Sequence, residues 1–389
     1  MSKARILPLI VLSQFFCTSL WFAGNAVIAG LNKDFPQSGN SFAHLASVVQ
    51  FGFITGTLLY AVLALVDRFP PSKVFFFSAL LAAFSNFAIV ISSHNFSMLL
   101  TFRFLTGFFL AGIYPVGMKI ASDHYGKDLG KVLGFLVGAL VLGTAFPHLV
   151  KNYSGQYLWK TVFTITSALA IIGGTIVLFI PGGPYATMST KIDLTLLFRI
   201  FRRPIFRSAS FGYFGHMWEL YTFWAFVPFM IMSWAHLHPE DHLNIAVLSF
   251  YVIAGGSIAC ITNGYLSQNY GAKKTAFVAL LLSGLCCCVS PLMVDMPFSI
   301  FIAFLIFWGM VVIADSPMFS TMVAQNAPAE SKGTALTIVT CIGFTITIVS
   351  VELLGYLQTI MNPRYLFLVL APGPVFGLAA LLAGRSKAA

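Results

Sequence analysis

The chain has 389 residues, of which 58% are hydrophobic and only 9% are charged. A water-soluble domain needs more charge on its surface, so this composition excludes one and predicts a polytopic membrane protein. A transmembrane helix takes about 20 apolar residues, which leaves room for about twelve helices and for no soluble domain beside them. The net charge of +10 does not indicate a nucleic-acid partner, because the positive residues gather between the apolar runs.

Apolar runs bounded by Gly, Pro or charged residues predict the membrane-spanning helices. The first run is interpreted as a span and not as a signal peptide, because it exceeds the about 7 to 15 apolar residues of such a peptide and lacks a small-residue cleavage site. The predicted spans are 5–30, 43–66, 72–93, 96–121, 129–150, 157–180, 208–235, 243–266, 274–293, 297–323, 333–358 and 364–384.

The positive charges are unequal on the two sides of these spans. With a cytoplasmic amino terminus, the outer loops hold only Lys33, Lys151, Lys160 and Arg364 of the 22 Lys and Arg residues. This bias predicts that both termini are cytoplasmic. The basic segment 181–207 is then a cytoplasmic linker between an N-terminal six-helix bundle, 1–180, and a C-terminal bundle, 208–389.

The two bundles repeat weakly in sequence. Gly107 precedes Pro115 in the fourth span at the same spacing at which Gly309 precedes Pro317 in the tenth. Parallel repeats with a binding site between them are a transporter architecture, which predicts a site at the midplane between spans 1, 4, 7 and 10.

The fourth span carries a charge at membrane depth, Arg103. A guanidinium facing lipid costs at least about 2.5 kcal/mol, so it must face a wet cavity or hydrogen-bond acceptors. Its planar fork suits a carboxylate, which makes Arg103 a candidate for binding an anionic substrate. A structural arginine tied to backbone carbonyls is the alternative.

Three carboxyl groups within the spans are candidates for proton coupling. Glu219 lies near the middle of the seventh span, where a carboxyl could take up and release a proton as a cavity opens and closes. Asp315 stands beside Pro317 in the tenth span, and Glu352 lies toward the outer end of the eleventh. A structural hydrogen bond or ion pair is the alternative for Glu219 and Asp315, and a simple interfacial position is the alternative for Glu352.

Aromatic and polar side chains in the first, fourth and seventh spans suggest a pocket for a small organic solute. Helical spacing places Trp21 and Asn25 on one face, and places Tyr221 beside both Trp218 and Trp224. Packing or lipid contact is the alternative, since the chain has 40 Phe. The candidate binding residues beside Arg103 are Trp21, Asn25, Tyr114, His216, Trp218, Tyr221 and Trp224.

No motif for an enzyme, a nucleotide or a cofactor is found in the sequence. The six cysteines fall in apolar runs without metal-ligand spacing, so no metal site is predicted from them. The outer loop holds His236, His238 and His242, for which weak metal binding and a solvated loop both stay open. Uphill movement of a solute would therefore depend on a gradient.

These residues resemble the major facilitator superfamily over essentially the whole chain. Its loop motif after the second helix is matched by Asp67, Arg68 and Lys73, and a second copy is matched by Gly264, Gly271, Lys273 and Lys274. The resemblance implies that these loops help to latch the cytoplasmic side. The phrases AGIYPVGMK and GHMWELYTFW look like those of uncharacterised bacterial members loosely related to cyanate and nitrate carriers.

The sequence thus predicts an all-α membrane protein of twelve helices in two pseudo-symmetric bundles, acting in a bacterial cytoplasmic membrane. The expected function is proton-coupled, alternating-access transport of a small organic and anionic solute. The expected partners are substrate, protons and membrane lipid, with no cofactor, no nucleic acid and a monomeric state. Export of a siderophore, metabolite or drug is the alternative, and a sensor without transport is a weaker one.

Overall fold

The computed structural model describes residues 3–35, 41–92, 95–125, 129–154, 158–185, 200–239, 243–327 and 332–384, and this part of the chain is helical without strands. Eleven of its helices are long and apolar enough to cross a membrane. The first predicted span is helical too, but it is broken into α1 (Lys3–Thr18), α2 (Ala23–Ala26) and α3 (Ile28–Asp34). The two-bundle fold of twelve spans is therefore confirmed.

The helices of the first half match the predicted spans within a few residues. After the first span come α4 (Ser41–Val62), the short α5 (Leu65–Arg68) and α6 (Pro71–Ile91). The fourth span is a pair, α7 (Phe96–Leu110) and α8 (Tyr114–His124), and α9 (Leu129–Tyr153) and α10 (Leu158–Val177) complete the half.

The second half has the same plan. It begins with α12 (Pro204–Leu237), α13 (Ile245–Tyr270) and α14 (Ala272–Met293). Its fourth span is again a pair, α15 (Phe298–Ala314) and α16 (Ser316–Asn326). The helices after it are α17 (Lys332–Leu357), α18 (Pro363–Leu366), η3 (Phe367–Leu370) and α19 (Pro372–Ala383).

The internal repeat has a physical basis in the paired fourth spans. Pro115 and Pro317 each lie in the first turn of the second helix of their pair, where a missing N–H costs nothing. A Cβ on Gly107 would overlap the carbonyl oxygen of Val49, and a Cβ on Gly309 would overlap that of Val252. The two glycines therefore allow the same close contact in each half, of α7 with α4 and of α15 with α13.

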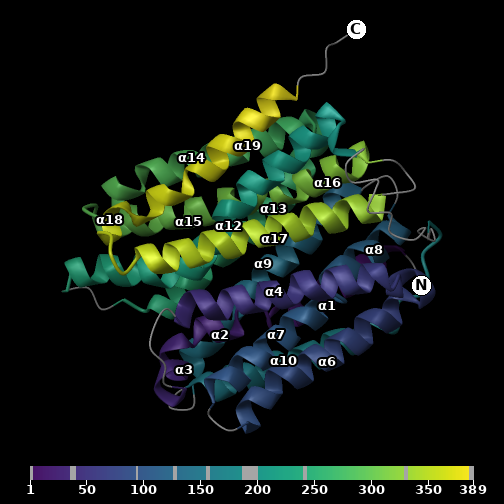
Figure 1. Ribbon diagram of the computed structural model, residues 1–389, viewed down its shortest axis with the longest axis horizontal. Helices are drawn as coiled ribbons and strands as arrows, with labels where there is room; N and C mark the ends of the chain where they lie inside the picture. The colour runs from purple at the N-terminus through teal and green to yellow at the C-terminus, as the bar shows by residue number, and fades with distance from the viewer. Residues whose placement is uncertain are drawn as a thin grey trace.

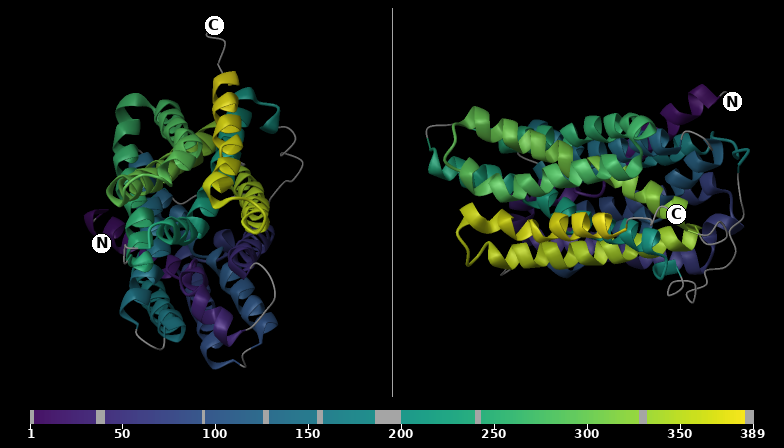
Figure 2. Two further views of the ribbon diagram at one scale, coloured as in Figure 1. Left: turned by 90° about the vertical axis from the view of Figure 1, so that its left-hand side faces the viewer. Right: turned by 90° about the horizontal axis from the view of Figure 1, so that it is seen from above.

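The two halves lie side by side with their helices running in a common direction (Figure 1). The largest contact between them is made by α9 and α13, and the next by α4 and α17. Both termini emerge at the same end of the bundle, here named the terminal end, and α3 and α18 mark the opposite, distal end (Figures 1 and 2).

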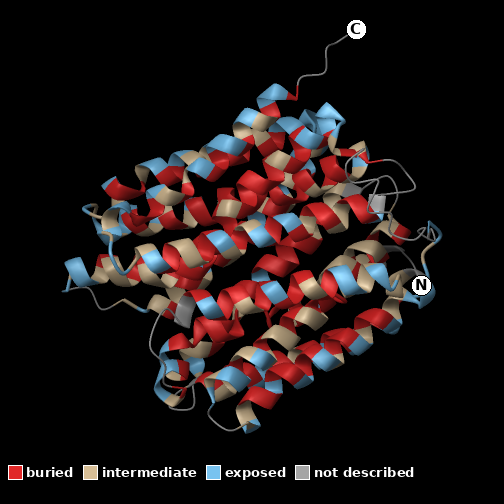
Figure 3. Cartoon of the chain, viewed as in Figure 1, coloured by how far each residue is buried: buried red, intermediate tan, exposed pale blue. Residues whose placement is uncertain are grey.

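Burial separates an interior from an apolar outer surface. Buried residues line the faces between helices, and exposed ones lie on the outer faces (Figure 3). Large apolar side chains such as Phe84, Ile91 and Phe179 are among the exposed ones. An apolar outer surface on fully hydrogen-bonded helices is what a lipid bilayer requires.

The predicted linker, 181–207, is described only in part, because 186–199 lie outside the described residues. The segment after α10 returns to α8, where the Tyr185 amide donates a hydrogen bond to the Asp123 carbonyl at 2.9 Å. The helix α12 begins at Pro204, before the predicted start of the C-terminal bundle at 208. The domain limits stay a prediction.

Candidate functional site

A cluster of buried aromatic rings joins the two halves at their centre. Trp21 lies 4.9 Å from Phe53 of α4, 5.7 Å from Tyr221 of α12 and 5.6 Å from Phe344 of α17, measured between ring centroids. The rings of Phe53 and Phe344 are 4.7 Å apart. The central aromatic cluster consists of Trp21, Phe22, Phe53, Tyr221, Trp224 and Phe344.

Two hydrogen-bond donors in this cluster have no acceptor among the described residues. Within the described residues, the indole Nε1 atoms of Trp21 and Trp224 are buried and have no hydrogen-bond partner. A buried donor without an acceptor costs about 1 to 3 kcal/mol, which a ligand that accepts a hydrogen bond from it would recover. The cluster therefore combines flat apolar walls with two free donors, as a binding site for a small organic molecule does.

Arg103 is buried in the first half, in contact with the backbone of Trp21. Its Nη1 donates to the Leu20 carbonyl at 3.0 Å and to Asn86 Oδ1 at 3.1 Å, and its Nη2 donates to the Trp21 carbonyl at 2.5 Å. These acceptors lie in the break between α1 and α2 and on α6. Each is neutral, so the guanidinium holds the broken helix without a carboxylate partner among the described residues.

Glu219 occupies the interior of the second half. Its Oε1 accepts hydrogen bonds from Ser283 Oγ at 2.6 Å, from Trp308 Nε1 at 2.7 Å and from Cys287 Sγ at 3.3 Å. These donors lie on α14 and α15, so the carboxyl faces away from the first half. Three donors compensate in part for removing a charged group from water.

His216 and Asp315 form a second buried polar site, which links α12 to the break between α15 and α16. His216 Nδ1 lies 2.8 Å from Asp315 Oδ1, and both side chains are only 1% exposed. His216 lies one helical turn from Glu219, so the two sites are neighbours. All three predicted intramembrane acids lie in the second half, and two of them, Glu219 and Asp315, are buried in its interior.

The remaining predicted binding residues lie around the cluster or apart from it. Asn25 is buried on α2, next to the broken segment. Tyr114 is the first residue of α8 and is partly buried against the core. Trp218 points away from the cluster, because its Nε1 donates to the Val369 carbonyl of η3 at 3.0 Å.

Two polar contacts link the halves at the distal end, and together they are named the distal seal. Glu352 of α17 forms an ion pair with His44 of α4, with Oε2 and Nδ1 3.1 Å apart. The second contact belongs to the other helix pair between the halves, α9 and α13. Asn244 Nδ2, at the start of α13, donates to Asn152 Oδ1 of α9 at 2.6 Å. Glu352 therefore bridges the halves, at a place where both side chains are partly exposed.

The residues predicted to form latches lie at the terminal end. Arg68 and Lys73 are exposed, and the side chain of Asp67 lies outside what the structure describes. Gly264 packs in the contact of α13 with α9, close to Gly134. Gly271 joins α13 to α14 with a φ of 81°, a conformation that favours glycine, and Lys273 Nζ donates to the Gly384 carbonyl at 3.1 Å.

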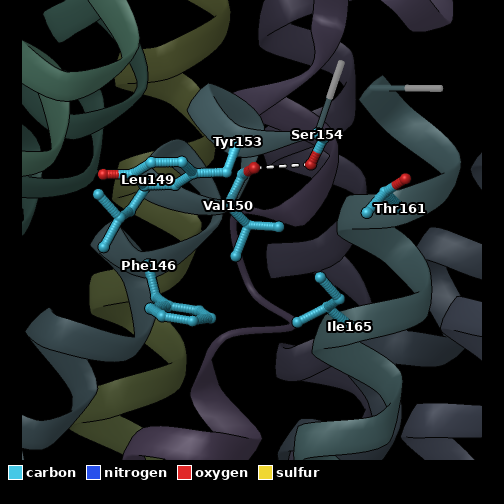
Figure 4. Close-up of a pocket in the computed structure, with 7 residues that line it drawn as sticks. All are labelled: Phe146, Leu149, Val150, Tyr153, Ser154, Thr161 and Ile165. Carbon is cyan, nitrogen blue, oxygen red and sulfur yellow. Dashed lines mark hydrogen bonds between the residues drawn. The ribbon is translucent and has the colours of Figure 1, made fainter. Parts of the chain in front are cut away.

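A cavity of about 290 Å³ lies between α9 and α10 near the distal end (Figure 4). It is open to the surface, is lined by one half alone and is mostly apolar. None of its lining residues belongs to the central aromatic cluster, so it is not the site between the halves. Its lining residues are Phe146, Leu149, Val150, Tyr153, Ser154, Thr161 and Ile165.

The possible metal site in the outer loop is described only in part, since His242 lies outside the described residues. The ring of His238 stacks on Trp234 with centroids 3.9 Å apart, and its Nδ1 lies 3.0 Å from the Trp234 carbonyl. Within the described residues there is no group of three potential metal ligands.

Sequence reasoning missed three members of the central aromatic cluster, Phe22, Phe53 and Phe344. They carry no polar atom and stand among 40 Phe. In a membrane protein both the lipid-facing and the core-facing surfaces are apolar, so periodicity does not separate them. A position opposite Trp21 or Tyr221 becomes visible only when the two halves are assembled.

The fold and this site define a multi-pass membrane protein of two matching halves around a shared aromatic centre. The chain matches the family model of the Major Facilitator Superfamily over residues 10–350 and 209–389. It is 31% identical over 218 residues to the niacin transporter NiaP of Acinetobacter baylyi, covering 49% of this chain and 46% of that protein. It is 27% identical over 169 residues to an uncharacterised transporter of Schizosaccharomyces pombe, covering 40% of this chain and 32% of that protein.

The chain belongs to the major facilitator superfamily. The predicted family is thereby confirmed. The matched segments span less than half the length of either curated relative, so substrate and mechanism do not follow from these matches. The closer likeness to cyanate and nitrate carriers stays a prediction.

Proposed function

We propose that the protein moves a small organic solute across the membrane by alternating access and binds it in the central aromatic cluster. The observation that carries this proposal is that the cluster takes rings from both halves, from the α1–α2 break and α4 on one side and from α12 and α17 on the other. A ligand held there touches both halves. Rocking of one half against the other would then expose it to either side in turn.

The chemistry of the cluster favours a flat aromatic solute with an anionic group. The rings of Trp21, Phe53 and Phe344 pack directly on one another, and when the halves part they would offer faces on which a planar molecule can stack. The free indole N–H groups of Trp21 and Trp224 can donate to a carboxylate. Arg103 donates to the backbone carbonyl of Trp21 and to other neutral acceptors, so no partner cancels its positive charge. This charge favours an anion in the cluster without direct contact. A relative that is a niacin transporter supports a pyridine carboxylate as the first solute to test.

The proton-coupling role falls to Glu219 or to the pair of Asp315 and His216. Both sites are buried in the second half, next to the helix that carries Tyr221 and Trp224. Uptake or release of a proton changes the charge in this interior and so changes the energy of its packing. Glu352, the third predicted carrier of a proton, is better placed to hold the halves together at the distal end.

Substrate binding can be tested on the purified full-length protein by tryptophan fluorescence and isothermal calorimetry. Niacin and benzoate should bind, and acetate should bind far more weakly because it has no ring to stack. Trp21→Phe and Trp224→Phe keep a ring but remove the donor, so each should weaken niacin binding about fivefold.

Trp218→Phe is the matched control, because the Trp218 indole already has an acceptor outside the cluster. Binding in this variant should equal that of the natural protein. Equal losses in all three variants, or equal affinity for acetate and niacin, would place the solute elsewhere than in the central aromatic cluster.

A further inference from the structure

A second cavity, far from the central aromatic cluster, lies at the terminal end of the second half. It has a volume of about 210 Å³ and sits where α12 and α14 begin and where α16 and α19 end. It is named the corner cavity. Its lining residues are Ile205, Ser208, Ala209, Lys273, Met322, Asn326, Leu381 and Gly384.

The corner cavity is amphipathic. Ile205, Ala209 and Leu381 give it apolar walls, and Lys273 brings a cation to it. One donor of the Lys273 ammonium is used by the Gly384 carbonyl at 3.1 Å, which fixes the group at the cavity. An ammonium has three donors, and among the described residues no carboxylate pairs with this one. The charge is thus available to a ligand.

The surroundings of the corner cavity are basic. Arg202, Arg203 and Arg207 are exposed at the start of α12, and Lys274 follows Lys273 on α14. The described acids of the second half lie elsewhere. Glu219 and Asp315 are buried in its interior, and Asp295 and Glu352 lie at the distal end. An anion is therefore attracted to this corner without competition from a nearby carboxylate in the described chain.

We propose that the corner cavity binds a membrane phospholipid with an anionic headgroup. Basic pockets between membrane helices at a positively charged face are suited to such headgroups. Lys273, which lines the cavity, would hold the phosphate, and the exposed Arg202, Arg203 and Arg207 near the start of α12 would add to the attraction. The apolar walls and the half-exposed Ile205 and Leu382 would accept the upper part of an acyl chain. These walls argue for a lipid over a free phosphate ion, which has nothing to bury against them.

Such a lipid would act as a clamp on the second half. It would touch α12, α14, α16 and α19 at once, because each of these helices contributes to the cavity wall. Two of the four, α12 and α16, also carry the buried His216–Asp315 pair or lie at its break. Lipid binding should therefore stabilise the half that holds the proposed proton sites.

The test uses native mass spectrometry and thermal unfolding of the purified full-length protein. Phosphatidylglycerol and phosphatidylcholine with identical acyl chains are added to the detergent-solubilised protein. Phosphatidylglycerol should bind in a saturable way and raise the unfolding temperature, and phosphatidylcholine should not. The variant Lys273→Gln should bind phosphatidylglycerol about fivefold more weakly. Arg207→Gln, which changes an exposed residue, should weaken binding in the same direction and covers the case in which Lys273→Gln folds poorly.

Arg5→Gln is the matched control, since it removes one exposed positive charge from the terminal end of the other half. This variant should bind phosphatidylglycerol like the natural protein. An equal loss in Arg5→Gln would mean general attraction to the basic face and would overturn the proposal. So would equal binding of phosphatidylcholine, or stabilisation by glycerol 3-phosphate alone to the same extent as by the lipid.

Discussion

Arg103 illustrates at the level of one residue how a charge is tolerated inside a membrane protein. The break between α1 and α2 exposes backbone carbonyls that have no water to bond, and the guanidinium supplies donors to those of Leu20 and Trp21. A planar group with five donors can serve several acceptors at once, which an ammonium cannot do in the same geometry. The same contacts set the position of the Trp21 ring in the central aromatic cluster.

Replacement of Arg103 by lysine should lower the stability of the protein although the charge is kept. A lysine keeps the charge but cannot reach all three acceptors, and each buried acceptor left unpaired costs about 1 to 3 kcal/mol. The unfolding temperature of Arg103→Lys in detergent should therefore fall by several degrees. Arg68→Lys, at an exposed position, should leave it unchanged. An unchanged unfolding temperature with a loss of niacin binding would instead indicate direct contact with the solute.

Glu219→Gln should separate proton coupling from solute binding. The amide oxygen can still accept from Ser283 and Trp308, so the variant should fold, but its side chain can no longer exchange a proton. In proteoliposomes, uptake driven by an imposed pH gradient should be lost and exchange of labelled for unlabelled solute should persist.

Two further variants complete that measurement. Asp295→Asn is the control, because this carboxyl lies at the surface and pairs with Arg364. Asp315→Asn is measured in parallel, since its carboxyl is the other buried candidate. Normal pH-driven uptake in both Glu219→Gln and Asp315→Asn would refute proton coupling at either site.

At the level of elements, the close contacts at Gly107 and Gly309 should respond alike to the same change. A methyl group at either position meets a carbonyl oxygen of the facing helix, so the helices must move apart. Overpacking of this kind costs about 1 to 3 kcal/mol. Gly107→Ala and Gly309→Ala should each lower the unfolding temperature by similar amounts.

Gly182→Ala is the control for those two variants, because nothing lies within 4 Å of a Cβ built at Gly182. It should unfold at the same temperature as the natural protein. A clear loss in one of the two helical variants and none in the other would show that the halves are not equivalent in this contact.

The length and apolarity of the spans could be predicted from the sequence, but their breaks could be predicted only in part. Pro115 and Pro317 mark the two paired fourth spans, since proline begins a helix readily and disrupts its interior. The break at residues 19–22 of the first span has neither proline nor glycine. The carbonyls of Leu20 and Trp21 in this break accept hydrogen bonds from Arg103, which lies far away in sequence, so no local rule could find the break.

The same limit applied to the candidate site. Trp21, Tyr221 and Trp224 stood out because tryptophan and tyrosine are few and carry polar atoms. Whether each faces the partner half, its own half or lipid depends on the rotation of its helix, and Trp218 shows the difference, since its indole bonds within the second half. Phe53 and Phe344 had no signal that distinguished them from other Phe residues.

Across the whole molecule, the two halves share an architecture but differ in the charge they bury. Arg103 bonds to the first and third spans of its half from the fourth, and Glu219 bonds to the third and fourth spans of its half from the first. Each charge forms these hydrogen bonds within its own half. In the alternating access proposed above, each half would move as one body, and the contacts that change would be those between the halves.

The distal seal is one such set of contacts, and its loss should open the distal end. Removal of a partly exposed ion pair costs about 0.2 to 1 kcal/mol, which shifts an opening equilibrium up to about fivefold. In a variant without native cysteines, Ser47→Cys reports on opening, because Ser47 is buried on α4 one turn from His44. Labelling of this thiol by a polar reagent should rise up to fivefold when Glu352→Gln is added, and His44→Gln should add nothing further.

A position about halfway along α13 supplies the control for that experiment. Ser257 is buried on α13, where its hydroxyl donates to the Gly138 carbonyl at 2.9 Å. A thiol introduced there as Ser257→Cys should not label faster when Glu352→Gln is added, because opening of the distal end leaves the contact of α13 with α9 near Gly138 closed. Equal increases at both positions would show that loss of the ion pair loosens the whole interface, and the distal end would then not open independently of the rest.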